Sequence, residues 1–118
     1  MLAYLGDAVL ELAVRGKLVR ARAANIPPEL LHGEALLFVT AAKQSEAVEN
    51  ILPVLTETET EIYKRGRNAK NRAPKSASAT DYRRATGLEC LFGYLYLAGD
   101  QARIQELFDI AFGEAVEE

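Results

Sequence analysis

Apolar side chains recur at intervals of three and four residues along nearly the whole chain, and an alternating apolar and polar pattern never persists. The first such stretch predicts an amphipathic helix over about residues 2–20, with an apolar face made of Leu5, Ala8, Val9, Leu12, Gly16 and Val19. A strand would show a period of two, so the pattern predicts an all-α fold without a sheet. No internal repeat is present.

Prolines divide the next part of the chain into two further predicted helices. Asn25-Ile26-Pro27-Pro28 starts the second helix, because proline is tolerated in a first turn. Its apolar face would consist of Leu30, Leu31, Ala35, Phe38, Val39 and Ala42. A third helix is expected from Lys43 to Leu52, where the ring and missing N–H of Pro53 would stop it.

Capping residues set the expected bounds of the remaining helices. Thr56 and Glu59 have the spacing of a capping box and begin a fourth helix that ends near Gly66. Residues 68–78 form the only long irregular stretch and are predicted to be a loop. Thr80-Asp81 would cap a fifth helix reaching Ala98, with Leu88, Leu91, Phe92 and Leu95 facing inward. Gly99-Asp100 would then cap a last helix from Gln101 to about Ala115.

Length and composition predict one domain over residues 1–118. With 49% hydrophobic residues, such a chain can bury a single core. Cys90 is the lone cysteine, so an internal disulfide is impossible, and its apolar surroundings predict that it fills core volume. No apolar run approaches the roughly 18 residues of a membrane span, and no secretory signal is recognisable. We therefore expect a cytoplasmic protein.

Positive charge is concentrated in one part of an acidic chain. The net charge is −3, but residues 64–84 carry +7, which leaves −10 for the rest. The basic residues are Lys64, Arg65, Arg67, Lys70, Arg72, Lys75, Arg83 and Arg84. Such a segment can attract a polyanion despite an acidic total, although a solvated surface loop would look the same.

A glycine and an aspartate interrupt the first helix within LAYLGDAVLE. Glycine costs about 1 kcal/mol relative to alanine inside a helix, and a carboxylate among apolar neighbours risks desolvation. Gly6 and Asp7 are therefore expected to serve something other than stability. With one histidine and one cysteine, a Cys/His metal cluster is excluded, and no phosphate-binding glycine loop is present.

Glu89 repeats this arrangement in the fifth predicted helix. It lies among apolar residues, and Gly93 follows one turn later, where another helix could approach closely. Two acids in apolar helices need each other or a metal. Oxygen ligands suit Mg²⁺, so Asp7 and Glu89 are the candidate metal ligands of a phosphodiester hydrolase.

Three segments resemble a known family in the expected order. LAYLGDAVLEL, KRGRNAK and YRRATGLECLFGYLYL are similar to the signature segments of Mini-ribonuclease III, compact relatives of bacterial ribonuclease III. The resemblance implies an all-helical ribonuclease III domain that works as a homodimer and cleaves double-stranded RNA with Mg²⁺ or Mn²⁺. It also implies catalytic, metal-binding roles for Asp7 and Glu89, with 5′-phosphate and 3′-hydroxyl products.

The resemblance further implies maturation of precursor 23S ribosomal RNA as the physiological role. Duplex RNA is recognised mainly through phosphates and 2′-hydroxyls, so cations should dominate its binding. We expect the backbone contacts to come from Lys64, Arg65, Arg67, Lys70, Arg72 and Lys75.

Some positions depart from full-size ribonuclease III. Two further acids of those enzymes correspond here to Ala3 and Thr86, so more of a metal's ligands would be water or phosphate. Glu11 lies one turn after Asp7 and could share its face, but a solvated helix position is the simpler interpretation. No double-stranded RNA-binding domain follows the helices, and a short segment before the signature helix is expected to be missing.

Two other classes of protein remain compatible with these residues. One is a catalytically silent RNA-binding module, which the reduced set of carboxylates would favour. The other is a helical interaction domain whose basic segment meets an acidic protein. Metal-dependent cleavage of duplex RNA would distinguish the enzyme from both.

Overall fold

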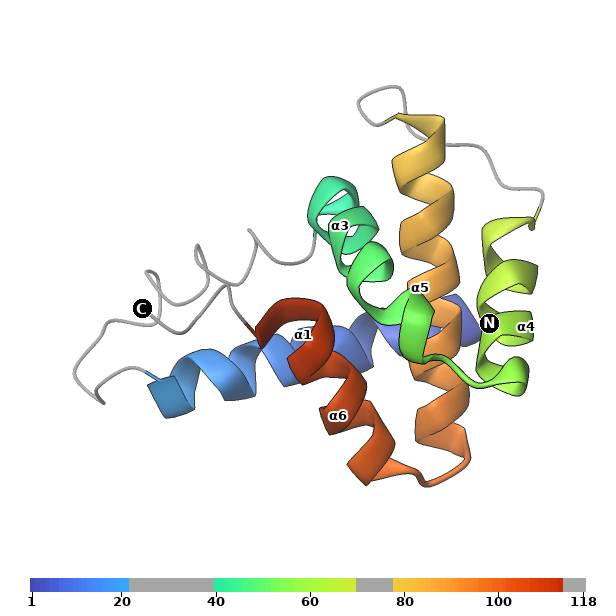
Figure 1. Cartoon of the computed structure of the whole chain (residues 1–118). Helices are drawn as coiled ribbons and strands as arrows, with labels where there is room; N and C mark the ends of the chain where they lie inside the picture. Colours follow the sequence, from blue (N-terminus) through green and yellow to red (C-terminus); the bar gives the residue numbers. More distant parts are fainter. Residues whose placement is uncertain (22–39, 70–77, 114–118) are drawn as a thin grey trace.

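The computed structural model describes residues 1–21, 40–69 and 78–113, in which every regular element is helical (Figure 1). The elements are α1 (Leu2–Ala21), α3 (Ala41–Ile51), a 3₁₀ turn η1 (Leu52–Val54), α4 (Glu57–Arg67), α5 (Ala79–Leu97) and α6 (Gln101–Phe112). The predicted all-α class is confirmed. The predicted second helix falls almost wholly in residues 22–39, outside the described ranges.

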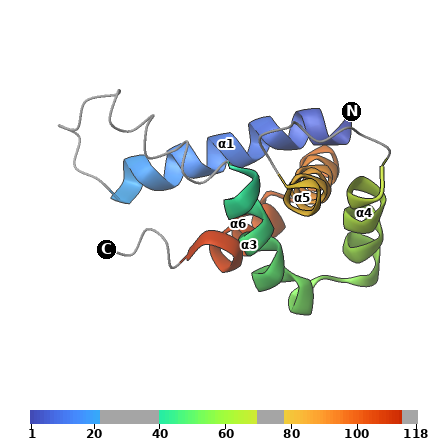
Figure 2. The same cartoon turned by 90° about the horizontal axis from the view of Figure 1, so that it is seen from above.

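Helix α5 is the centre of the arrangement. Seen from above, α1 passes over one side of α5 and α4 lies along another (Figure 2). Helices α3 and α6 complete the surroundings, and both also contact α5. Residues from both ends of the sequence therefore meet on one helix. None of the described helices combines the length and the apolar character that crossing a membrane would require.

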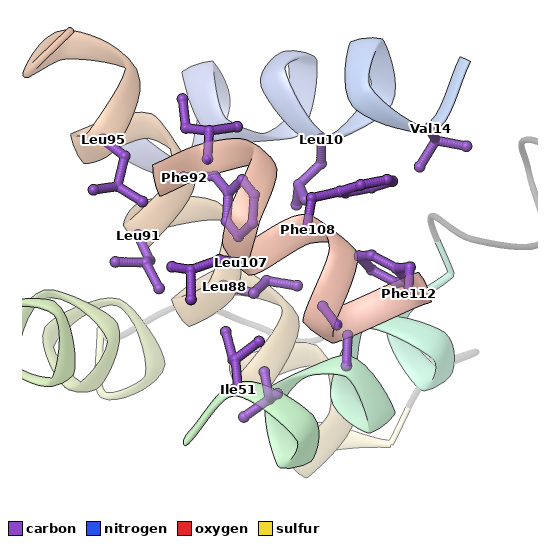
Figure 3. Packing of buried hydrophobic residues seen from close by; sticks show 14 of the residues in the cluster. Leu10, Val14, Ile51, Leu88, Leu91, Phe92, Leu95, Leu107, Phe108 and Phe112 are labelled. Atoms are coloured by element: carbon purple, nitrogen blue, oxygen red, sulfur yellow. The ribbon is translucent and has the colours of Figure 1, made fainter. Parts of the chain in front are cut away.

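The core is formed by one face of each surrounding helix against α5 (Figure 3). The inward residues predicted for α5 are Leu88, Leu91, Phe92 and Leu95, and all four are buried, as expected. They pack with side chains from α1, α3, α4 and α6, namely Leu10, Val14, Leu18, Val48, Ile51, Tyr63, Leu107, Phe108 and Phe112. Burial of each large apolar side chain contributes about 1.5–3 kcal/mol, so this cluster is the main stabilising term.

The helix predicted over α1 is confirmed, but its predicted apolar face is only partly right: Val9 packs against the core, while other residues of that face point outward. The buried residues are Leu10, Val14 and Leu18, whereas Leu12 and Val19 are 72% and 62% exposed. Ala8 is exposed as well. The cause is that α1 carries apolar residues on two faces, and the periodicity does not say which face meets the core.

Helix ends follow side-chain capping, with small shifts from the expected bounds. The capping box of Thr56 and Glu59 is present, and Asp100 caps α6 after Gly99, whose φ is +74°. Helix α5 begins earlier than expected, because the Ser78 hydroxyl accepts the Asp81 N–H. Helix α3 likewise begins at Ala41 behind Thr40. At Pro53 the chain continues as the 3₁₀ turn η1.

Arg103 of α6 connects α6 to α4. The Arg103 guanidinium of α6 donates to both carboxylate oxygens of Glu59 at 2.7 and 2.8 Å. It also donates to the Val54 carbonyl at 2.8 Å. Glu59 is only 5% exposed, and these hydrogen bonds hold its pKa below the ordinary value. Helix α4, which carries the first basic residues, is thereby held in a defined position.

Candidate active site

Glycines let the backbones of α1 and α5 meet. A methyl group at Gly6 would lie 1.6 Å from the Glu89 carbonyl oxygen, and one at Gly93 would lie 2.2 Å from the Leu2 carbonyl oxygen. No side chain fits at either distance. The close approach expected at Gly93 is therefore confirmed, and Gly6 has its counterpart on the other helix. The two glycines set α1 against α5 at the level of Asp7 and Glu89.

The Asp7 and Glu89 side chains are brought together by this contact. They are hydrogen-bonded to each other, with Asp7 exposed and Glu89 half-buried. Burial, followed by the negative charge of Asp7, raises the pKa of Glu89 to about 8. The sequence predicted desolvation of Asp7, but in the structure it is Glu89 that is partly buried. At neutral pH the metal-free protein therefore keeps a proton on Glu89, because burial and the adjacent Asp7 charge disfavour its ionised form.

A third polar side chain, Gln44 of α3, reaches the pair and was not predicted from the sequence. It is 1% exposed, and its side chain hydrogen-bonds to Glu89. This hydrogen bond favours the charged carboxylate, opposing the effects of burial and of Asp7. A glutamine among the polar residues of α3 gives no sequence signal of such burial. Only the packing of α3 on α5 reveals it.

The donor set of this pair fits a hard divalent cation. Two carboxylates on neighbouring helices would supply oxygen ligands, and a bound cation would favour the ionised form of Glu89 that burial and the Asp7 charge oppose. Over residues 1–21, 40–69 and 78–113, no group of three or more His, Cys, Asp or Glu residues is arranged to hold a metal. Water and substrate oxygens would complete the coordination, which Mg²⁺ accepts.

The other residues considered near the site have local partners. The buried Thr86 donates its hydroxyl hydrogen to the Tyr82 carbonyl at 2.9 Å. Glu11 pairs with Arg15 at 2.6 Å on the surface of α1. Thr86 and Glu11 therefore each have a hydrogen-bond or ion-pair partner within their own helix.

The basic segment begins on α4, whose backbone lies close to α5. A methyl group at Gly66 would lie 2.7 Å from the Cys90 sulfur, and one at Gly87 would lie 2.7 Å from Tyr63. Cys90 is half-buried at this contact. Of the predicted RNA-binding residues, Lys64 and Arg65 are exposed, and Arg67 lies over the Tyr63 ring. Lys70, Arg72 and Lys75 are outside the described residues.

The raised pKa of Glu89 predicts the pH dependence of stability in the metal-free protein. The folded-state value of about 8 exceeds the ordinary 4.5, so the folded state retains a proton that the unfolded chain releases. The contribution of this proton to the free energy of unfolding is complete below about pH 4.5 and is lost as the pH rises through 8. Allowing for the partial solvent access of Glu89, we expect a loss on the order of 3 kcal/mol in the free energy of unfolding.

Denaturant unfolding at several pH values, with a chelator present, measures this dependence. Glu89→Gln should remove most of the slope between pH 5 and 8, whereas Glu46→Gln, at an exposed position of α3, should keep it. An unchanged slope in Glu89→Gln would show that another group binds the proton.

Known proteins are similar to this chain in sequence and in fold. Residues 1–100 match the family model described as the Ribonuclease III domain. A Mini-ribonuclease 3 from Thermoanaerobacter sp. strain X514 is 43% identical over 112 residues, which cover 94% of this chain and 78% of that relative. A Mini-ribonuclease 3 from Symbiobacterium thermophilum is 44% identical over 111 residues, covering 93% and 84%. A crystal structure of a Fusobacterium nucleatum protein superposes with a TM-score of 0.84 and 30% identity, covering 97% of this chain and 90% of that one.

Proposed function

The chain belongs to the ribonuclease III family of endoribonucleases, and we propose that it uses Asp7, Glu89 and Mg²⁺ to cleave the double-stranded RNA on which the family acts. The observation that carries this proposal is the carboxylate pair that the Gly6 contact brings together. Nothing in the packing of α1 on α5 requires two acids there. A pair of adjacent carboxylates lowers stability unless it has a ligand to hold.

Each residue of the pair has a distinct part in the proposed mechanism. Asp7 is exposed and offers its oxygens to the solvent side, where the RNA backbone would lie. Glu89 is half-buried and would give up its proton on holding the cation. Bound Mg²⁺, or Mn²⁺ with the same oxygen ligands, would activate water and stabilise charge on the scissile phosphate and the leaving 3′ oxygen. The products would carry 5′ phosphates and 3′ hydroxyls.

The proposed physiological substrate is precursor 23S ribosomal RNA. The support is the similarity over most of the chain to proteins named Mini-ribonuclease 3, the compact group that the sequence resembles. That substrate would place the protein in the cytoplasm.

Incubation of the protein with a labelled RNA duplex, with and without Mg²⁺, tests the proposed function. Single-stranded RNA and duplex DNA of the same sequence serve as controls. We expect cleavage of the RNA duplex only, and only with the metal. Binding without cleavage would favour a silent RNA-binding module, and the absence of both would favour a protein-interaction domain.

The exposed cations of α4 are proposed to contact the RNA backbone, together with Arg67, Lys70, Arg72 and Lys75. We expect Arg65→Ala to weaken duplex binding and to lower the slope of log affinity against log salt concentration by about 0.7 to 0.9, because one phosphate contact is lost. Single-turnover cleavage at saturating enzyme should change far less. Binding titrations across salt concentrations measure the slope.

Arg20→Ala is a matched control for this measurement. Arg20 is also an exposed cation, but it lies in the last turn of α1, away from α4 (Figure 1). It should leave the slope unchanged. Equal slopes for Arg65→Ala and the wild type would show that the α4 residue makes no phosphate contact.

The proposed homodimer is supported by the outer face of α1. Tyr4, Leu12 and Val19 are 88%, 72% and 62% exposed, and their spacing of seven and eight residues places them along one side of the helix. Large apolar side chains exposed along one helix face are a feature of interaction surfaces. In a symmetric dimer the same face of each copy would pack against its counterpart.

Leu12→Glu tests this assembly. We expect the wild type to sediment as a dimer at micromolar concentration and Leu12→Glu to sediment as a folded monomer, because a charge would be buried in the interface. Circular dichroism should show unchanged helix content, since Leu12 makes no part of the core. A fully active monomeric wild type would contradict the proposed assembly.

A further inference from the structure

Gln44 is a buried amide at the acid pair. Only 1% of its surface is exposed, although Lys43 before it and Glu46 two residues after it are exposed. Burying an amide costs free energy unless it is hydrogen-bonded. Here the side chain hydrogen-bonds to Glu89 across the α3–α5 interface. Burial of a polar side chain at this position is therefore coupled to the carboxylate of the candidate site.

Both ends of this contact are held in place by packing. Ala47 and Val48, which follow Gln44 on α3, are at most 1% exposed and belong to the core. On the other helix, Leu88 is fully buried and the Glu89 backbone is held against Gly6. The carboxylate end of Glu89 is the part left to rotate. A hydrogen bond from α3 restricts that rotation.

An amide is well suited to this place. It donates a hydrogen bond without adding a negative charge to the two carboxylates already present. The amide donor restricts rotation of the Glu89 carboxyl group and leaves it able to meet Asp7, with which Glu89 is also hydrogen-bonded.

We infer that Gln44 is a positioning residue that orients the Glu89 carboxylate toward Asp7 for cation binding. This inference rests on the proposed Asp7–Glu89 metal site. Partners that orient a metal ligand contribute about 10- to 100-fold to metal affinity or activity. Gln44 therefore acts on the affinity for the cation, through Glu89, and not on the affinity for RNA.

The test compares Gln44→Met with Ser45→Ala. Methionine keeps the length and much of the volume of glutamine but cannot donate the hydrogen bond. Ser45 is 6% exposed in the same interface and accepts from Arg84 at 3.3 Å, so its loss perturbs α3–α5 packing away from the acids. Mn²⁺ binding is followed without RNA by the electron paramagnetic resonance signal of the free ion. Cleavage is then measured against Mg²⁺ and against duplex concentration.

We expect Gln44→Met to weaken Mn²⁺ binding at least about tenfold and to raise the half-saturating Mg²⁺ concentration similarly. The KM for duplex RNA at saturating Mg²⁺ should remain within about twofold of the wild-type value, and Ser45→Ala should change neither metal measurement. If Gln44→Met does not fold, Gln44→Asn replaces it. That variant keeps an amide but withdraws it from Glu89 by one methylene, and the same loss of metal affinity is expected.

Either of two results would overturn the inference, and the Asp7→Asn variant distinguishes between them. If the folded Gln44 variant binds Mn²⁺ as the wild type does, while Asp7→Asn abolishes binding, Gln44 only fills space and the proposed metal site stands. If Asp7→Asn leaves Mn²⁺ binding unchanged, the proposed site itself fails and the role of Gln44 fails with it.

Discussion

Replacing Asp7 by asparagine should reduce cleavage of duplex RNA by roughly 10²- to 10⁴-fold, since metal-ion stabilisation of the transition state contributes several kcal/mol. The amide keeps the shape of the side chain but loses the charge that holds the cation. Glu89→Gln should have a similar effect for the same reason. Both variants should retain duplex affinity, because the basic residues of the α4 segment are unchanged. Single-turnover kinetics and filter binding separate the two properties.

Glu11→Gln and Glu46→Gln are the matched controls. Glu11 lies on the same helix as Asp7 but pairs with Arg15, and Glu46 pairs with Lys43 on α3 at 3.6 Å. We expect both variants to cleave at close to the wild-type rate. Near-normal activity of Asp7→Asn at subsaturating Mg²⁺ would remove Asp7 from the site. A large loss in Glu11→Gln would instead add that residue to it.

The second large effect is expected from Gly6→Ala. Alanine would favour an isolated helix by about 1 kcal/mol, yet its methyl group would lie 1.6 Å from the Glu89 carbonyl oxygen. The obstacle is backbone, so α1 and α5 must separate. We expect a net destabilisation of about 3 kcal/mol and loss of cleavage, because overpacking offsets the helix propensity and displaces Asp7 from Glu89. Denaturant unfolding and cleavage rates measure the two effects.

Gly16→Ala provides the comparison within the same helix. A methyl group there would meet only the end of the Arg20 side chain, at 3.1 Å, and that side chain is free to move outward. Gly16→Ala should therefore raise the free energy of unfolding by a few tenths to about 1 kcal/mol and leave cleavage unchanged. If both variants were equally stable, the contact at Gly6 would not restrict the approach of the helices.

Strong local signals made most of the fold predictable. The inward residues of α5 follow from its helical periodicity, and the capping box at Thr56 follows from residue spacing alone. The predicted cap of α5, Thr80, is replaced by Ser78; serine and threonine both cap helices well, so residue type alone does not choose between the two positions. For α1, a helix apolar on two sides defines no unique inner face.

The candidate site was predictable only where a residue type is unusual for the segment in which it occurs. Gly6 and Asp7 weaken an otherwise regular apolar helix, and Glu89 is an acid in a buried one, so their types alone indicate a role. Gln44 contradicts nothing, because glutamine is a good helix former among the polar residues of α3. Its place beside Glu89 depends on how two helices from different parts of the chain pack, which residue types do not encode locally.

The contact between α1 and α5 also has a consequence for folding kinetics. Asp7 and Glu89 are 82 residues apart in the sequence, so the pair forms only after a long loop has closed, whereas α5 and α6 are neighbours along the chain. Helices can form early without creating the carboxylate pair. During refolding from denaturant, recovery of nuclease activity should therefore follow the docking of α1 onto α5 and lag behind the recovery of helical circular dichroism.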